Sequence, residues 1–204
     1  MKKVSHKTIA RSLIYIRTLE RLLSSKKEFV SSKELADMIG LTDVQVRKDI
    51  SNFGKVGKPR VGYKISDLKK TLENFILKKP VGLALFGVGN LGAAILKYPG
   101  FNESRVSFKV AFDNDPKKIG KSFGKIKIYS VKNALKIISE NEIEIGVIAV
   151  SEKNSQKIAD IIVKSGIKGI LNFSPTTINV PDGVMINNID LAIEFLSLSW
   201  MIRN

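Results

Sequence analysis

Residues 81–92 read VGLALFGVGNLG, an apolar run that leads directly into three glycines with the spacing Gly-x-Gly-x-x-Gly. A second apolar run, VSFKVAFD at 106–113, ends in Asp113, which lies 21 residues beyond Gly92. This pattern is typical of a strand, a glycine turn, a helix and a second strand that ends in an acidic residue. It predicts a dinucleotide-binding unit in which Asp113 accepts hydrogen bonds from the adenosine ribose.

The glycines of this turn have separate tasks. Gly87 permits a tight turn after the strand, Gly89 lets the backbone approach a diphosphate, and Gly92 lets the helix pack closely on the strand. The start of the helix then offers free N–H groups and the positive end of its dipole to the diphosphate. The predicted cofactor contacts of the turn are Gly87, Val88, Gly89, Asn90, Leu91 and Gly92.

Short apolar strands and amphipathic helices alternate after Asp113. KIKIYS, IEIGVIAVS and KGILNF have strand character, whereas VKNALKIISE and SQKIADIIVKSG have helix character. This alternation predicts an α/β fold with a parallel sheet that is covered on both faces. Ligands bind such sheets at the carboxyl ends of the strands, which adds Val150, Phe173 and Pro175 to the predicted site.

The charge of Asp113 favours NAD and NADH over NADP, because a carboxylate repels a 2′-phosphate. Lys117 and Lys118 lie close in sequence and soften this preference. An alternative that the residues leave open is a Rossmann domain that binds another adenine cofactor, such as coenzyme A.

No catalytic set accompanies the predicted site. The chain has one histidine, His6, and no cysteine, and no Lys–Tyr or His–carboxylate pair can be assigned to hydride transfer. We therefore expect a protein that is not an enzyme and for which the nucleotide is a signal; a small dehydrogenase is the least favoured alternative. No apolar run reaches the roughly 18 residues of a membrane span, and no signal peptide is evident, so we expect a cytoplasmic protein.

Positive charge is concentrated in the N-terminal part of the chain. The net charge is +15; residues 1–80 hold 19 Lys and Arg against 8 Asp and Glu, and residues 81–204 hold 15 against 11. Such a surplus in one domain indicates a polyanionic partner. The alternative from charge alone is a solvated lysine-rich surface.

The basic part has the pattern of a helix-turn-helix. Amphipathic helices are predicted at 7–24, 32–39 and 42–53, with Gly40 in the turn between the last two. In the last helix Val44, Ile50 and Phe53 are expected to face inward. Its polar residues would then contact double-stranded DNA, with Arg47 and Lys48 suited to guanine or phosphate. The predicted contacts of this helix are Gln45, Arg47, Lys48 and Ser51.

After Gly54 follows KVGKPRVGYKI, a segment that favours a β-hairpin wing. Lys55, Lys58 and Arg60 are expected to contact the DNA backbone or minor groove. A small helical protein-interaction domain with a basic loop is the alternative. A further amphipathic segment at 66–77 places the boundary between a DNA-binding domain, 1–80, and the nucleotide domain, 81–190.

These residues resemble the Rex family of redox-sensing transcriptional repressors along almost the whole chain. The motifs that carry the resemblance are VQVRKDISNFG, VGY at 61–63, LFGVGNLGAAIL, YPGF, AFDNDPKKIG, IKGILNFSP and NNIDLAIEFLSLSW. The resemblance implies a winged helix-turn-helix domain joined to a Rossmann-like domain. It also implies a homodimer that binds an inverted-repeat operator with NAD⁺ or alone, and that releases the operator when NADH binds.

The resemblance further implies that the C-terminal helix, within 191–204, is exchanged between subunits. A helix that is apolar nearly all round must be buried on several sides, which agrees with such an exchange. The charge switch of the family would fall on Arg17, Tyr98 and Asp190, and Tyr98 is also counted among the cofactor contacts. Pro59 departs from the glycine usual in the family's wing, so the tip of this wing is expected to differ.

Overall fold

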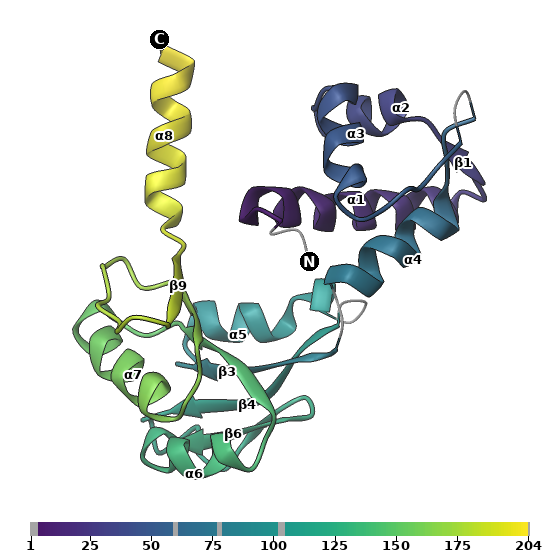
Figure 1. The fold of residues 1–204 in the computed structure, drawn as a ribbon. Coiled ribbons are helices and arrows are strands. Elements are labelled where there is room, and N and C mark those ends of the chain that lie inside the picture. The colour runs from purple at the N-terminus through teal and green to yellow at the C-terminus, as the bar shows by residue number, and fades with distance from the viewer. Residues whose placement is uncertain (1–3, 59–60, 77–78, 102–104, 204) are drawn as a thin grey trace. The chain divides into compact units, whose positions relative to one another are not determined.

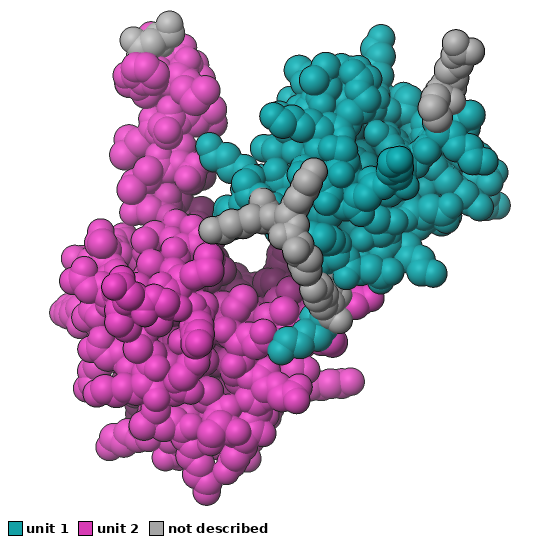
Figure 2. Space-filling model, viewed as in Figure 1, with its two compact units in different colours: residues 1–79 teal, residues 80–204 magenta. Residues whose placement is uncertain are grey.

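The computed structural model of the chain describes residues 4–58, 61–76, 79–101 and 105–203 (Figure 1). The chain forms two compact units, unit 1 (residues 1–79) and unit 2 (residues 80–204), coloured separately in Figure 2. Each unit has hydrophobic core clusters of its own. None of the helices within the described ranges is both long and apolar enough to cross a membrane.

Unit 1 is mainly helical. Its elements are α1 (His6–Ser24), β1 (Phe29–Val30), α2 (Ser32–Ile39), α3 (Asp43–Ser51), β2 (Tyr63–Lys64) and α4 (Ile65–Ile76). The side chains of Ser31 and Thr42 accept backbone N–H groups at the starts of α2 and α3. Gly40 ends α2 with a φ of 68°, a left-handed conformation that favours glycine. These caps fix the predicted helix-turn-helix between α2 and α3.

The side of α3 that faces the core differs from the prediction. Val46 and Ile50 are buried, whereas Val44, which was expected to face inward, is 61% exposed. Residues two positions apart on a helix point about 200° apart. Burial of Val46 therefore turns Val44 outward, onto the same side as the polar residues of the helix.

The wing segment (residues 55–64) begins after α3. Lys58 and Gly62 form an antiparallel bridge with N–O distances of 2.9 and 3.0 Å. Arg60, one of the predicted DNA contacts, and Pro59 lie outside the described residues. At the base of the wing β2 pairs with β1, a strand before α2 that the sequence analysis did not predict.

Unit 2 confirms the predicted α/β class. Its elements are β3 (Val81–Phe86), α5 (Asn90–Lys97), η1 (Pro99–Phe101), β4 (Val106–Asp113), β5 (Ser122–Phe123), β6 (Ile126–Ser130), η2 (Val131–Asn133), α6 (Ala134–Ser139), β7 (Ile143–Ile148), α7 (Glu152–Lys164), β8 (Gly169–Asn172), β9 (Met185–Asn188) and α8 (Leu191–Arg203). The strand order is β5-β6-β4-β3-β7-β8-β9. All neighbouring strands are parallel except β5, which is antiparallel to β6.

Helices cover both faces of this sheet (Figure 1). On one face Phe86 and Phe112 stack with ring centroids 4.8 Å apart and pack with residues of α6 and α7. On the other face Leu85 and Ala111 pack with Leu96 of α5. The chain runs from β3 to β4 on one side and reaches β7 on the other side of β3. The carboxyl ends of β3 and β7 thus form the point at which ligands bind in open α/β sheets.

The last helix, α8, has no buried residue. Its large apolar side chains, each more than half exposed, are Leu191, Ile193, Phe195, Leu196, Leu198, Trp200, Met201 and Ile202. Exposure of this much apolar surface on one element marks an interaction surface.

Candidate nucleotide site and nucleic-acid interface

Packing within the protein explains two of the three glycines in the turn after β3. Gly87 has a φ of 97°, and a Cβ atom there would lie 2.5 Å from the carbonyl oxygen of Ala149 on the neighbouring strand's loop. A Cβ on Gly92 would collide with the carbonyl oxygen of Gly87. These glycines let α5 and the end of β7 approach the turn closely.

Packing within the protein does not explain why residue 89 is a glycine. Its φ is −80°, which other residues adopt, and a Cβ atom there would meet nothing within 4 Å. Gly89 is the N-cap of α5, and no side chain caps this helix end. The turn therefore leaves open space beside the positive end of the α5 dipole, where the backbone can approach a diphosphate. Val88, Asn90 and Leu91, which were also predicted as cofactor contacts, lie at this end of α5.

Asp113 ends β4 directly beside the glycine turn. Its Oδ2 accepts the N–H of Val88 at 2.8 Å, and its Oδ1 accepts the N–H of Asp115 at 2.9 Å. Burial raises the pKa of Asp113, but these two hydrogen bonds and the nearby Lys118 outweigh burial and hold the pKa below its usual value. Asp113 is thus charged at neutral pH and able to accept hydrogen bonds from a ligand.

The other predicted contacts lie at the same edge of the sheet. Val150 follows β7, and its Cγ1 lies 2.8 Å from where a Cβ of Gly87 would be. Ser174 donates its hydroxyl to the carbonyl oxygen of Val150 at 2.7 Å, which ties the loop of Phe173 and Pro175 to the loop after β7. The structure therefore brings Val150, Phe173 and Pro175 to the edge that carries the glycine turn.

A buried asparagine fixes this loop, and the sequence analysis missed it. Asn172 is fully buried at the end of β8, and its Nδ2 donates to the carbonyl oxygen of Thr176 at 3.0 Å and to Oδ1 of Asn188 at 2.9 Å. Its Oδ1 accepts the N–H of Ser174 at 2.9 Å. The available signal was an asparagine at the end of an apolar strand, where an unpaired amide would be costly.

The three predicted switch residues lie in different elements. Tyr98 follows α5, about 12 Å along the helix axis from Asn90, so α5 separates it from the glycine turn. Asp190 accepts the N–H groups of Ala192 and Ile193 at 2.9 and 3.3 Å and thereby caps α8. Arg17 is exposed on α1 in unit 1. Their mutual pairing remains a prediction.

The outward side of α3 carries a set of residues with helical spacing. Val44, Arg47, Lys48 and Ser51 are all exposed, and the steps of three or four residues from Val44 to the Arg47–Lys48 pair and on to Ser51 place them on one side of the helix. Arg47 pairs with Asp43 on the preceding turn at 2.6 Å, and about half of its side chain is exposed. The face combines cations for guanine or phosphate with one apolar side chain suited to a thymine methyl group. Val44 is the residue of this face that the sequence analysis assigned to the core.

Gln45 belongs to a buried network centred on Asp49, which the sequence analysis also missed. Arg11 donates to Asp49 through Nε and through a terminal nitrogen at 2.6 and 2.7 Å, and the Tyr15 hydroxyl donates at 2.7 Å. Gln45 donates its Nε2 to Asp49 at 2.8 Å. Burial raises the pKa of Asp49, but these hydrogen bonds outweigh burial and hold the pKa of Asp49 below its usual value. Burial and the hydrogen bond to Asp49 raise the pKa of Tyr15. The network joins α3 to α1.

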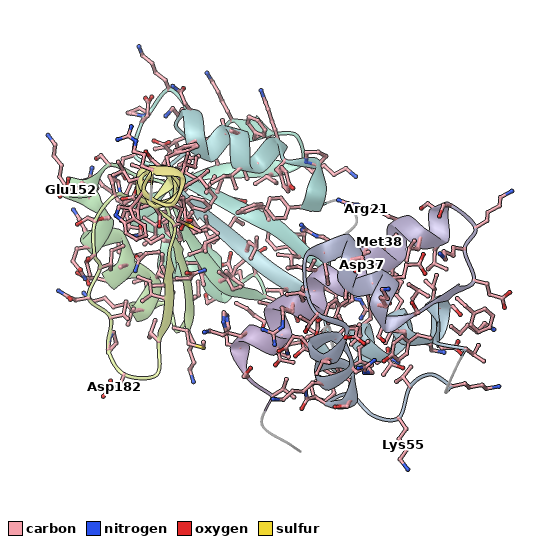
Figure 3. All side chains as sticks on the ribbon, turned by 90° about the horizontal axis from the view of Figure 1, so that it is seen from above. Arg21, Asp37, Met38, Lys55, Glu152 and Asp182 are labelled. Atoms are coloured by element: carbon pink, nitrogen blue, oxygen red, sulfur yellow. The ribbon has the colours of Figure 1, made fainter. Side chains whose placement is uncertain are left out.

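A groove of 790 Å³ lies between α3, the start of α2 and the wing segment. Among its lining residues are Ser32, Arg47, Ser51, Lys55, Lys58 and Tyr63. Figure 3 shows Lys55 extending away from the ribbon at the edge of unit 1. Among the described residues that line the groove, Arg47, Lys55 and Lys58 are cations and none is acidic, a composition that suits a phosphate backbone.

Two family descriptions match the chain. One, "Putative DNA-binding protein N-terminus", covers residues 3–51, and the other, "CoA binding domain", covers residues 78–176. Their extents correspond to the helix-turn-helix part of unit 1 and to most of the sheet of unit 2.

Curated relatives match along nearly the full length. A redox-sensing transcriptional repressor Rex from Carboxydothermus hydrogenoformans is 39% identical over 98% of this chain and 97% of the relative. The corresponding repressor of Clostridium acetobutylicum is 37% identical over 99% of this chain and 95% of the relative.

Solved structures agree. A crystal structure of RSP with β-NAD⁺ and operator DNA has a TM-score of 0.91 at 34% identity, covering 99% of this chain and 94% of that one. The structure of RSP with β-NADH has a TM-score of 0.87 at 33% identity, with coverage of 99% and 95%. A third crystal structure describes RSP as a Rex-family repressor.

Proposed function

Because the chain belongs to the Rex family of redox-sensing transcriptional repressors, we propose that it binds operator DNA through unit 1 and releases it when unit 2 binds NADH. The observation that carries the proposal is the pairing of two sites in one chain. An open glycine turn beside a charged Asp113 fits a dinucleotide, and a basic groove beside α3 fits DNA. RSP, the structurally similar protein, has been crystallised with β-NAD⁺ and operator DNA and with β-NADH.

In the nucleotide site each residue has a distinct task. The turn Gly87–Gly92 holds the diphosphate through backbone N–H groups, and Asp113 accepts hydrogen bonds from the ribose. Val150, Phe173 and Pro175 then contact the nicotinamide end at the carboxyl edge of the sheet. The nicotinamide, which is cationic in NAD⁺ and neutral in NADH, supplies the signal; this chain binds it without converting it.

In the DNA-binding unit the outward face of α3 enters the major groove. Arg47 and Lys48 contact guanine or phosphate, Ser51 donates to a polar edge or phosphate, and Val44 contacts a thymine methyl group. Lys55 and Lys58 contact the backbone beside the groove, with Arg60 assigned the same task from the sequence. Gln45, whose Nε2 is held by Asp49, presents its other amide atoms to DNA.

A second copy of the chain covers α8. The apolar helix exposes side chains on every side, so a partner that surrounds it is more favourable than one that covers a single stripe. A twofold dimer then places two copies of α3 on an inverted repeat, with half-sites about one helical turn apart or a multiple of this. Arg17, Tyr98 and Asp190 exchange partners between the two states. We place the dimer in the cytoplasm, where DNA and NADH are both available.

Release of DNA requires that NADH bind the DNA-free form more tightly than the DNA-bound form. A ligand with equal affinity for both forms shifts no equilibrium, however tightly it binds. Conversely, operator DNA must weaken NADH binding by the same factor, because the coupling is reciprocal. This sensor needs no chemical step on the nucleotide.

Sensing of coenzyme A is the second candidate, favoured by the match of residues 78–176 to the family described as "CoA binding domain". The ribose of coenzyme A carries a phosphate next to the hydroxyl that would donate a hydrogen bond to Asp113. The negative charge of Asp113 repels this phosphate. Calorimetric titration with NADH, NAD⁺ and coenzyme A decides between the two. We expect binding of NADH that is weakened at least tenfold in Asp113→Ala; binding of coenzyme A alone would refute the proposal.

A further inference from the structure

The turn after β4 brings a lysine back to the carboxylate that ends this strand. Asp115 accepts the N–H of Lys117 on its Oδ1 at 2.9 Å, and its carbonyl oxygen accepts the N–H of Lys118 at 3.0 Å. The turn places Lys118 Nζ 3.2 Å from Oδ2 of Asp113 and 4.0 Å from Oδ2 of Asp115. Sequence proximity alone did not distinguish Lys118 from Lys117, but the structure selects Lys118.

The hydrogen bonds of Asp113 leave little room for a ligand while Lys118 stays in place. A carboxylate has about four acceptor positions. Val88 and Lys118 both donate to Oδ2, and Asp115 donates to Oδ1. About one position remains, whereas a ribose diol brings two hydroxyls. Both hydroxyls can bind Asp113 only when the Lys118 side chain moves away.

Lys118 is able to move, unlike the two backbone donors. Its side chain is 37% exposed, against 12% for Asp113, and a lysine ammonium sits on a flexible four-carbon stem. The backbone N–H groups of Val88 and Asp115 are fixed by the glycine turn and by the turn after β4. Lys118 is therefore the exchangeable partner of Asp113.

We propose that Lys118 is a specificity-determining residue of the adenosine ribose site, which leaves Asp113 when the ribose binds and then lies within reach of the 2′ position. The inference rests on the proposed binding of NAD(H). A 2′-hydroxyl gains little from this cation, whereas a 2′-phosphate gains a charge-assisted hydrogen bond. Lys118 therefore offsets part of the repulsion between Asp113 and a 2′-phosphate, and the site discriminates less strongly between NADH and NADPH than Asp113 alone would.

The experiment compares the dissociation constants of NADH and NADPH for the full-length protein by calorimetry. Lys118→Met keeps the length of the side chain and removes its charge. We expect the ratio of the NADPH constant to the NADH constant to rise about tenfold, since one charge-assisted hydrogen bond to the phosphate is lost. NADH itself is expected to bind as tightly as before or more tightly, because Asp113 gains a free acceptor position.

Lys117→Met is the matched control. Lys117 is the adjacent lysine, its side chain is exposed, and it bonds Asp115 through its backbone N–H. The two variants lose the same net charge, so a general effect of charge would shift both ratios equally. We expect an unchanged ratio in Lys117→Met. In Asp113→Asn, which keeps Lys118, the ratio is expected to fall below that of the wild type.

The possible outcomes separate this inference from the function on which it rests. A wild-type protein that binds NADH, with an equal ratio in the wild type and in Lys118→Met, would overturn the role of Lys118 alone. Equal rises in Lys118→Met and Lys117→Met would also overturn it. A wild-type protein that binds neither NADH nor NAD⁺ would instead contradict the proposed function.

Discussion

Two glycines of the same turn are expected to respond in different ways to alanine. A methyl group on Gly92 would collide with the carbonyl oxygen of Gly87, so Gly92→Ala is expected to lower the free energy of unfolding by about 1–3 kcal/mol. A methyl group on Gly89 meets no protein atom within 4 Å. Gly89→Ala should leave the unfolding free energy within about 0.5 kcal/mol of wild type. It should also weaken NADH binding about tenfold, because the methyl group occupies the space for the diphosphate.

Urea unfolding and calorimetry on the two glycine variants measure both quantities. NADH binding by Gly89→Ala that equals the wild type would show that the open space beside α5 is not where the diphosphate lies.

Asp49 and Asp43 offer a matched pair, since each contacts an arginine and both belong to α3. Asp49 is 1% exposed, and Asp49→Asn leaves the Arg11 cation without its partner, at a cost of about 3 kcal/mol in unfolding free energy. The Asp43–Arg47 pair is exposed, so Asp43→Asn is expected to cost less than about 1 kcal/mol. Urea unfolding of the full chain, followed by circular dichroism, measures both changes; similar costs would contradict the role of the network.

The same network sets a dependence on pH. The pKa of Asp49 is lower in the folded protein than in the unfolded chain. Its contribution is therefore complete above the unfolded pKa, about 3.9, and is lost as the pH falls through the lower folded value. Unfolding free energy of the wild type should decline below about pH 4, and the difference from Asp49→Asn should shrink there. A difference that stays constant between pH 7 and pH 3 would count against this assignment.

Val44 is expected to contact a thymine methyl group. Operator duplexes in which single thymines are replaced by deoxyuridine lack one methyl group each. At one position per half-site the wild type should lose affinity about threefold to tenfold, since about 1 kcal/mol of apolar contact is removed. Val44→Ala should show a smaller loss at that same position. Fluorescence anisotropy measures both, and an equal loss in the two proteins at every position would exclude the contact.

At the level of single residues, spacing in sequence predicted the glycine turn and the carboxylate beside it better than the inward face of α3. The glycines and Asp113 have a fixed separation that follows from the fold, so their positions were predictable. Val44 was not, because a helix with Val44, Val46 and Ile50 allows two inward faces, and only the packing of α3 on α1 selects one. The burial of Asp49 could not be predicted for a similar reason, because its carboxylate is stabilised by Arg11 and Tyr15, which lie on another helix.

At the level of elements, the long periodic helices and the apolar strands matched their predictions closely. The short strands β1, β5 and β9 were not predicted, because segments of two to four residues show too little hydrophobic periodicity. β9 is a parallel edge strand of mixed polarity, and its pairing with β8 is decided by the sheet it joins. The loop of Phe173 likewise depends on Asn188 of β9 through the buried amide of Asn172.

The exposed apolar surface of α8 is expected to form the interface between two copies of the chain. Phe195 is 72% exposed and Leu198 is 55% exposed, so charges at both positions are compatible with the folded chain but not with an apolar interface. We expect analytical ultracentrifugation to find the wild type as a dimer and the double variant Phe195→Glu and Leu198→Glu as a monomer at the same concentration.

Leu135→Glu provides the control for α8, since Leu135 is also about half exposed but lies alone on α6. It should leave the wild-type mass unchanged. A double variant of α8 that keeps the dimer mass would place the dimer interface elsewhere.

For the molecule as a whole, the features expected to bind DNA and those expected to bind the nucleotide lie in two separate compact units. Unit 1 holds most of the surplus positive charge, the groove beside α3 and the buried network that fixes α3. Unit 2 holds the glycine turn, Asp113 and the loops tied together by Asn172 and Ser174. A sensor built in this way depends on differential binding between two states and not on any contact seen in one of them.

The most direct measurement titrates NADH into a complex of the protein with an inverted-repeat operator that the protein itself has selected from random DNA. Fluorescence anisotropy of the labelled operator reports release, with NAD⁺ as the comparison. We predict that NADH lowers operator affinity at least tenfold, that NAD⁺ does not, and that Asp113→Ala binds the operator but no longer responds to NADH. Equal operator affinity with saturating NADH and with saturating NAD⁺ would contradict the account.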